Sequence, residues 1–228
     1  DDVRFKDSKC AQVPFHRVSV ELRTEIVGLK RPDLVPVSTV NRHLSPQEWH
    51  ALLEDPSPKL LIDTRNKFET QLGTFRGAID PEMTKFSEWP QFVESADLPQ
   101  ETPILIFCTG GIRCEKAILE LQQRGYDNVF QLRDGILGYL EEFPEGHFEG
   151  ECFVFDDRVA VDGHLNPSTT FGICPGCGLT SEIKKVCLVC DSPYFVCPAC
   201  LGSWRPVCSK SCRDLFDRHG ESARDHYP

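Results

Sequence analysis

The stretch CTGGIRC, from Cys108 to Cys114, places two cysteines around a pair of glycines and an arginine. Gly110 and Gly111 allow a tight turn whose backbone N–H groups point inward, and such a turn can bind an anion. Arg113 adds a full positive charge. A thiol in that setting has a lowered pKa and is a nucleophile. We therefore expect Cys108 to be the catalytic thiolate.

The other residues of this stretch have defined expected roles. The backbone N–H groups of the loop, Thr109, Gly110, Gly111 and Ile112, would bind the sulfur anion together with the Arg113 guanidinium. For Cys114 two interpretations stay open. It could resolve an oxidised Cys108 by forming a disulfide, or it could be a small side chain packed in the first turn of a helix. The two cysteines do not form a C-x2-C pair, and no nearby histidine completes a metal site.

A second group of cysteines lies near the C-terminal end. Four short pairs of cysteines occur there: Cys174/Cys177, Cys187/Cys190, Cys197/Cys200 and Cys208/Cys212. Two such pairs complete one four-thiolate zinc site, so we predict two structural zinc ions. A set of disulfides and an iron–sulfur site are the alternatives, and the spacing leaves the pairing of the pairs open. No motif for a flavin, a haem or a nucleotide cofactor is visible in the sequence.

The elements that would position Cys108 alternate between strands and helices. Residues 102–109 predict a buried strand that ends at the loop, and residues 114–126 predict a helix that starts there. Strands are also expected in 59–66 and 128–132. Helices are expected in 44–55, with a Ser45–Glu48 capping box, in 84–95, where the helix is interrupted or begins near Pro90, and in 134–144. This order predicts a parallel sheet with helices on both faces, which binds ligands at the carboxyl ends of its strands. Residues 16–28 predict a further strand, followed by a linker over 30–41.

The six positions CTGGIR (108–113) resemble the active-site loop of the rhodanese family, whose cysteine carries sulfur as a persulfide. Residues 60–79, with Asp63, Arg65 and a Gly-Ala turn, and residues 131–140 resemble further rhodanese segments. The arginine falls at C-x4-R, one residue short of the C-x5-R loop of related phosphatases. Asp63 and Arg65 are therefore candidate site residues, although an ordinary ion pair that caps a loop explains them equally well.

A closer resemblance uses more of the chain. The stretch CTGGIRCEKA (108–117), residues 155–167 and the cysteine-rich end are together similar to the tRNA uridine hydroxylase family of rhodanese-domain proteins, which includes eukaryotic thiosulfate sulfurtransferase/rhodanese-like proteins. The resemblance implies a tRNA partner and oxygen-dependent conversion of the wobble uridine to 5-hydroxyuridine. The alternative activity is transfer of sulfur from a donor such as thiosulfate through a Cys108 persulfide.

Composition and domain organisation agree with such a protein. We expect a remnant of an N-terminal ferredoxin-like domain in 1–40, a rhodanese domain in 41–150, a connecting segment in 151–173 and the zinc module in 174–228. The net charge is −10, which disfavours non-specific nucleic-acid binding, although residues 165–228 hold seven Lys and Arg against six Asp and Glu. No apolar run is long enough to span a membrane. Free thiols predict a reducing compartment, the cytoplasm, with targeting to an organelle left open.

Overall fold

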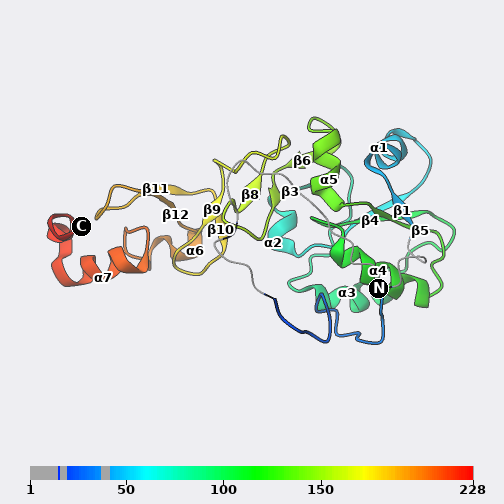
Figure 1. The fold of residues 1–228 in the computed structure, drawn as a ribbon, viewed down its shortest axis with the longest axis horizontal. Coiled ribbons are helices and arrows are strands. Elements are labelled where there is room, and N and C mark those ends of the chain that lie inside the picture. Colours follow the sequence, from blue (N-terminus) through cyan, green and yellow to red (C-terminus); the bar gives the residue numbers. More distant parts are fainter. Residues whose placement is uncertain (1–14, 16–19, 37–41, 228) are drawn as a thin grey trace. The chain divides into compact units, whose positions relative to one another are not determined.

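The structure is a computed structural model that describes residue 15, residues 20–36 and residues 42–227 (Figure 1). The chain divides into two compact units. The first contains residues 1–157 and 161–166, and the second contains residues 158–160 and 167–228. Within the described residues, no helix is both long and apolar enough to cross a membrane. The domain boundaries expected from the sequence stay predictions.

A four-stranded parallel sheet forms the centre of the first unit. Its strands are β1 (His43–Leu44), β2 (Leu60–Asp63), β4 (Ile104–Phe107) and β5 (Val129–Leu132), in the order β1-β5-β4-β2. All three pairings are parallel, and at the carboxyl edge Asp63 of β2 lies opposite Phe107 of β4. The parallel sheet predicted from the alternating elements is confirmed.

Helices cover both faces of this sheet (Figure 1). On one face, α3 (Trp89–Ser95) and α4 (Ile112–Gln123) pack in a core with Ile104 and Ile106. On the other face, α1 (Pro46–Glu54) and α5 (Gly135–Glu142) pack in a second core with Leu105 and Phe107. Successive residues of β4 belong alternately to the two cores because successive side chains of a strand point to opposite faces of the sheet.

Local signals placed several of these elements correctly. Ser45 caps α1 in a complete capping box with Glu48, as predicted. Gly125, just past the end of α4, has a φ of +86°, the left-handed conformation expected of a glycine that ends a helix. The helix after the cysteine loop begins at Ile112 and not at Cys114, so Arg113 and Cys114 belong to its first turn.

The N-terminal prediction is wrong where it can be compared. Residues 20–28 contain no strand, while residues 16–19 and part of the linker, 37–41, lie outside the described residues, as does most of the expected 1–40 remnant. Helix α2 (Lys67–Thr70) and the antiparallel pair of β3 (Gly73–Phe75) with β6 (Phe148–Gly150) were not predicted, and the 3-10 helix η1 (Phe86–Glu88) leads directly into α3. Two further short strands follow, β7 (Cys152–Phe153) and β8 (Ala160–Val161).

The second unit consists of two hairpins and two short helices. Strand β9 (Gly172–Ile173) pairs with β10 (Thr180–Ser181), and β11 (Lys184–Val186) pairs with β12 (Pro193–Phe195). Helices α6 (Pro198–Leu201) and α7 (Lys210–His219) and the 3-10 helix η2 (Gly220–His226) follow. The buried core is small and contains cysteines with Val189, Val196 and Val207. So small a core gains stability from cross-links or bound metal.

Candidate functional site

The cysteine loop lies at the carboxyl end of β4, where parallel sheets bind ligands. Gly111 is the N-cap of α4 and has a φ of +78°, a conformation that a residue with a side chain rarely adopts. Gly110 lies outside that region, and a Cβ added to it would meet nothing within 4 Å. Of the two glycines, only Gly111 is required by the backbone conformation of the turn.

The Cys108 sulfur is held by hydrogen-bond donors on several sides. The N–H of Gly111 donates to Sγ at 3.1 Å. Burial alone would raise the pKa of Cys108. The hydrogen bond from the Cys114 thiol, the charge of Arg113 and the N–H groups of Arg113 and Cys114 outweigh burial and lower that pKa to about 5. Cys108 is therefore largely a thiolate at neutral pH, the form that acts as a nucleophile.

Cys114 is the hydrogen-bond donor to that thiolate. Burial, its hydrogen bond with Cys108 and the negative charge of Cys108 raise the pKa of Cys114 well above its usual range. Its sulfur also lies 3.7 Å from the Thr64 hydroxyl, and its side chain is fully buried. The position is compatible with both roles left open by the sequence, and it adds a third, which is the stabilisation of the Cys108 thiolate.

Arg113 is fixed by a residue that the sequence did not single out. Its two terminal nitrogens donate to the two carboxylate oxygens of Glu69 at 2.5 and 2.7 Å, and the Glu69 side chain is fully buried. Glu69 also accepts from the N–H of Asn66 at 3.0 Å, in the capping box of α2. The Asn66-x-x-Glu69 pattern could have predicted this cap. The pairing with Arg113, 44 positions away, has no local sequence signal.

A second support comes from the N-terminus of α5. The N–H of Ile136 donates to the Cys108 carbonyl at 2.9 Å, and the N–H of Leu137 donates to the Thr109 carbonyl at 3.1 Å. Gly135, with a φ of +65°, allows this approach. A Cβ there would lie 2.4 Å from the Cys108 carbonyl oxygen and 2.6 Å from the Gly111 nitrogen. The DGILGYL segment therefore sets the position of the loop.

Asp63 and Arg65 form a buried ion pair at the end of β2. Arg65 Nη2 donates to Asp63 Oδ2 at 2.7 Å and to the Gly73 carbonyl at 2.6 Å, and the Thr74 hydroxyl donates to Asp63 at 2.8 Å. Both side chains of the pair are completely buried. Among the described residues, neither of them lines the pocket at Cys108. The structure therefore places the pair where it ties β3 to β2.

A pocket of about 430 Å³ opens at the loop. Cys108, Thr109, Gly110, Ile112 and Arg113 form part of its wall. The remainder includes residues that the sequence did not predict, among them Arg23, Ile26, Phe86 and Phe155.

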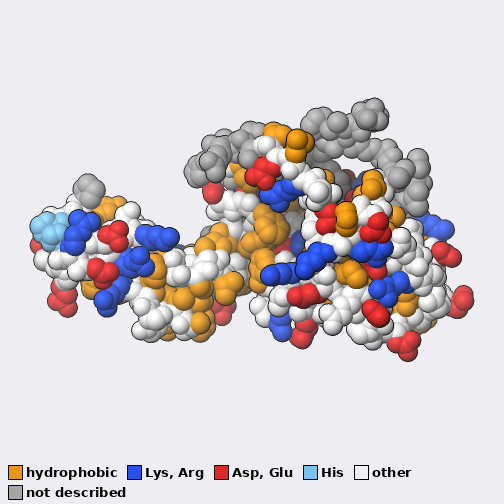
Figure 2. Space-filling model, turned by 90° about the horizontal axis from the view of Figure 1, so that it is seen from below, with side chains coloured by type: hydrophobic (Ala, Val, Ile, Leu, Met, Phe, Trp, Pro, Cys, Tyr) orange, Lys and Arg blue, Asp and Glu red, His pale blue; other side chains and the backbone are white. Residues whose placement is uncertain are grey.

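Figure 2 shows that basic and acidic side chains are interspersed on the visible face of the molecule, in keeping with the unfavourable charge for non-specific nucleic-acid binding.

An exposed aromatic ring stands at this pocket. The Phe155 side chain is 64% exposed, its ring centroid lies 5.9 Å from the Arg113 guanidinium carbon, and it contacts Phe153 edge to face at 5.0 Å. A large apolar side chain exposed beside a reactive thiolate and an arginine is suited to stacking on a flat ring of a ligand.

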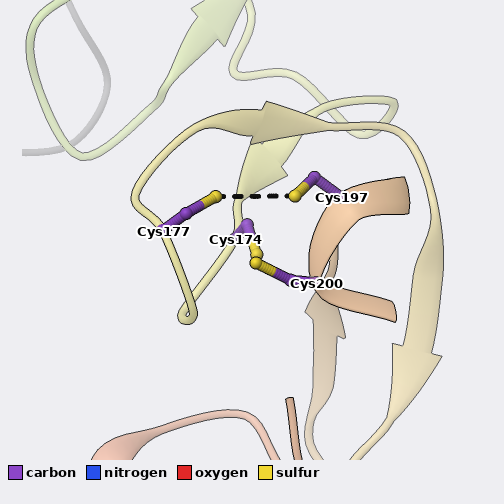
Figure 3. A group of neighbouring side chains, drawn as sticks. All are labelled: Cys174, Cys177, Cys197 and Cys200. Carbon is purple, nitrogen blue, oxygen red and sulfur yellow. Dashed lines mark hydrogen bonds between the residues drawn. The ribbon is translucent and has the colours of Figure 1, made fainter. Parts of the chain in front are cut away.

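The eight cysteines of the second unit form two tetrads. One contains Cys174, Cys177, Cys197 and Cys200 (Figure 3), and the other contains Cys187, Cys190, Cys208 and Cys212. The pairing is interleaved, so the first short pair joins the third and the second joins the fourth. The sequence left this open, because the gaps between the pairs permit either arrangement.

The tetrads have the geometry of closed metal centres. The sulfur atoms of each lie within 4.8 Å of one another, and the Sγ–Sγ distances include 3.5 Å for Cys177–Cys197 and 3.5 Å for Cys190–Cys208. A tetrahedral zinc ion with Zn–S bonds of about 2.3 Å separates its sulfur ligands by about 3.8 Å. A disulfide requires about 2.05 Å, so these cysteines are free thiols. Each tetrad can therefore bind a metal ion.

The sequence is similar to two family models and to curated proteins. The model described as a rhodanese-like domain matches residues 45–142, and that described as rhodanase C-terminal matches residues 149–213. A protein of Bdellovibrio bacteriovorus named tRNA uridine(34) hydroxylase is 49% identical over 220 residues, which are 96% of this chain and 63% of that protein. A protein of the same name from Acaryochloris marina is 40% identical over 89% of this chain and 66% of its own length. The chain thus spans about two thirds of the curated relatives it matches.

Solved structures of rhodanese-like proteins are more distant. A rhodanese-like domain protein of Staphylococcus aureus is 19% identical, with a TM-score of 0.38 over 43% of this chain and 90% of its own. A thiosulfate sulfurtransferase of Pseudomonas aeruginosa is 23% identical, with a TM-score of 0.41 over 48% of this chain and 20% of its own. The fold assignment rests on the family model and on the parallel strand order, which together confirm the rhodanese-like α/β fold expected from the sequence.

Proposed function

Because the chain belongs to the family of rhodanese-domain proteins whose curated relatives are named tRNA uridine(34) hydroxylase, we propose that it is an enzyme that hydroxylates the wobble uridine of tRNA. Cys108 is its essential residue. The observation that carries the proposal is the buried Cys108 thiolate at a pocket of about 430 Å³, in a chain 40–49% identical to those relatives.

The pocket suits a single unpaired base. Ligand pockets of about 300–1,000 Å³ enclose small molecules, and a wobble uridine lies in a single-stranded loop from which its base can be turned outward. Phe155 offers a face on which a uracil ring can stack, while Arg23 at the pocket wall is paired with Glu21. In this arrangement the thiolate of Cys108 meets the ring inside the pocket, while the rest of the tRNA stays outside.

The residues of the chain have the following roles in the reaction. Cys108 is the nucleophile, and the N–H groups of the loop with Arg113 stabilise its anion. Cys114 keeps its proton and donates a hydrogen bond to Cys108. Asp63 and Arg65 position the strand end next to the loop. The product is 5-hydroxyuridine, whose formation from uridine is a two-electron oxidation with molecular oxygen as the oxidant. The reaction takes place in the cytoplasm, where tRNA and reduced thiols are both found.

We also assign one zinc ion to each tetrad. Four thiolates that can surround one ion tetrahedrally form a closed structural site. The two zinc ions would link the two hairpins to the two helices in a unit whose own core is small. Native mass spectrometry of the chain, after exchange into zinc-free buffer, should report two retained zinc ions. Fewer than two retained zinc ions would contradict this assignment.

Complementation tests the activity. The chain is expressed in a bacterial strain that lacks its own tRNA uridine(34) hydroxylase, and tRNA nucleosides are measured by mass spectrometry. Wild type should restore 5-hydroxyuridine, Cys108→Ser should restore none, and Phe155→Ala should restore less. Cys152→Ala is the matched control, because Cys152 is buried and its burial raises the pKa of its thiol to about 12.

One result would overturn the proposal. If wild type and Cys108→Ser give the same 5-hydroxyuridine level while purified wild type transfers sulfur from thiosulfate to cyanide in a Cys108-dependent manner, the chain is a sulfurtransferase. If the protein is folded, its zinc sites are filled and neither activity is detected, both the hydroxylase and the sulfurtransferase assignments are wrong.

A further inference from the structure

A cluster of two imidazoles and one carboxylate lies in the first unit, outside the Cys108 pocket. His50 and Glu54 are four residues apart on α1, and His147 comes from the turn between α5 and β6. One ligand atom from each lies within 4.8 Å of the other two, and His50 Nε2 is 3.5 Å from Glu54 Oε1. No motif in the sequence predicted this cluster.

The spacing of the ligand atoms is close to that of a bound metal ion. Residues four apart on a helix lie on one face, so His50 and Glu54 point the same way. Ligands bound at about 2.0–2.2 Å to a shared ion are separated by about 3–4.4 Å. The His50–Glu54 distance already falls in this range. Glu54 ends its helix and its side chain is 63% exposed, so it can make the small movement that closes the remaining gap.

His50 is oriented by the groups behind it. Its Nδ1 lies 2.8 Å from the Tyr139 hydroxyl, and its ring stacks on Phe143 with centroids 4.1 Å apart and planes 6° apart. A metal-bound histidine usually donates from its other ring nitrogen to a fixed acceptor, and Tyr139 is in the place of that acceptor. The same hydroxyl accepts from the backbone N–H of His147 at 3.1 Å, so one tyrosine is hydrogen-bonded to both residues.

The His147 ring provides an independent indication of a ligand. Its Nε2 is buried and has no hydrogen-bond partner among the residues that the structure describes. A buried polar nitrogen without a partner is destabilising, and a bound cation would supply the missing partner. His147 and Glu54 also form part of the wall of a pocket of about 770 Å³, which gives an ion a path of entry.

We propose that His50, Glu54 and His147 bind a divalent transition-metal ion of the zinc class. Two imidazoles and one carboxylate are a donor set that zinc and its neighbours prefer, and three protein ligands leave a coordination position open. Glu54 and His147 line a pocket whose wall also contains Lys59 and Arg76, so water or a small anion in this pocket would complete the coordination. The site is independent of the activity proposed above and of the two cysteine tetrads.

Zinc titration of the full chain tests this site. The tetrads are filled first, and Zn²⁺ is then added while native mass spectrometry and calorimetry follow a third ion. Wild type should bind it, and Glu54→Gln and His147→Gln should each weaken its binding by about tenfold or more. Glu141→Gln, which removes the same charge from an exposed position of α5, should leave binding unchanged. Zinc should also raise the melting temperature of wild type more than that of Glu54→Gln.

Two outcomes would overturn the site. In the first, wild type saturates at the two ions of the tetrads. In the second, a third ion binds with the same affinity in wild type, Glu54→Gln and His147→Gln, which places it elsewhere. Repeating the titration with Cys108→Ser tests whether Cys108 is a ligand, and that variant should still bind the third ion. Since Glu54 is exposed, its substitution tests binding without disturbing the core.

Discussion

Removal of the Cys114 thiol tests the origin of the Cys108 nucleophile. In the structure, the Cys114 thiol is the largest of the groups that lower the pKa of Cys108 to about 5. A hydrogen bond to a charged acceptor contributes about 1.5–3 kcal/mol, and one pKa unit corresponds to about 1.4 kcal/mol. Cys114→Ala should therefore raise the pKa of Cys108 by about one to two units. Cys114→Ser keeps a donor and should raise it less.

The pH dependence of alkylation measures this change. Cys108 reacts as the thiolate, so its rate with iodoacetamide rises with pH and reaches half its maximum at the pKa. For wild type the midpoint should lie at about pH 5, with the plateau reached by neutral pH. For Cys114→Ala the midpoint should lie at about pH 6–7, because the thiolate has lost its strongest donor. Mass spectrometry of the Cys108 peptide, with the tetrads protected by zinc, separates this thiol from the others.

An unchanged midpoint in Cys114→Ala would refute a role of Cys114 in ionising Cys108. If Cys114→Ala and wild type have the same midpoint, then Cys114 is a packing residue and the charge and backbone of the loop suffice to ionise Cys108. Cys152→Ala is the control for loss of a buried thiol and should leave the midpoint in place, because Cys152 donates to the Phe153 carbonyl and not to Cys108.

Three further predictions concern the loop and the second unit. Gly135→Ala should displace the loop, slow alkylation of Cys108 and lower the free energy of unfolding by about 1–3 kcal/mol, because the added Cβ would lie within 2.6 Å of three loop atoms. Gly110→Ala should leave the alkylation rate and the stability unchanged. Urea unfolding and alkylation rates measure both variants. The ratio of the alkylation rate with neutral iodoacetamide to that with anionic iodoacetate should be larger at Cys108 than at free cysteine, because Glu69 offsets the charge of Arg113. An equal or smaller ratio at Cys108 would show that the arginine charge dominates. Removal of metal with a strong chelator should unfold the second unit at a temperature at which the first unit is still folded. Circular dichroism with limited proteolysis checks this, and loss of the first unit before the second would contradict it.

The parts of the site that the sequence predicted are those with local signals. A strand that ends in Cys108, a glycine turn and a following helix are coded within about a dozen residues, and so is the cap at Ser45. The short cysteine pairs likewise marked all eight cysteines of the two tetrads. In each case the residues that act together are neighbours in the chain.

The missed parts are brought together only by folding. Glu69 reaches Arg113 from another helix, and Gly135 reaches the loop from the helix that follows β5. Neither contact has a spacing that a sequence pattern can reveal. The interleaved pairing of the cysteines depends on how two hairpins pack, and the strand predicted in 16–28 failed over 20–28 because alternation of apolar residues does not supply a partner strand.

The charges of the loop bear on the choice between substrates. At neutral pH the Cys108 thiolate and Glu69 carry one negative charge each and Arg113 carries one positive charge, so the three together are negative. The thiolate is held in addition by neutral donors, namely the Cys114 thiol and backbone N–H groups. A second anion brought to this buried place, such as thiosulfate, would meet repulsion that little water screens. An uncharged uracil ring would not, and it would gain contact with Phe155. The electrostatics of the loop therefore favour a neutral base over an anionic sulfur donor.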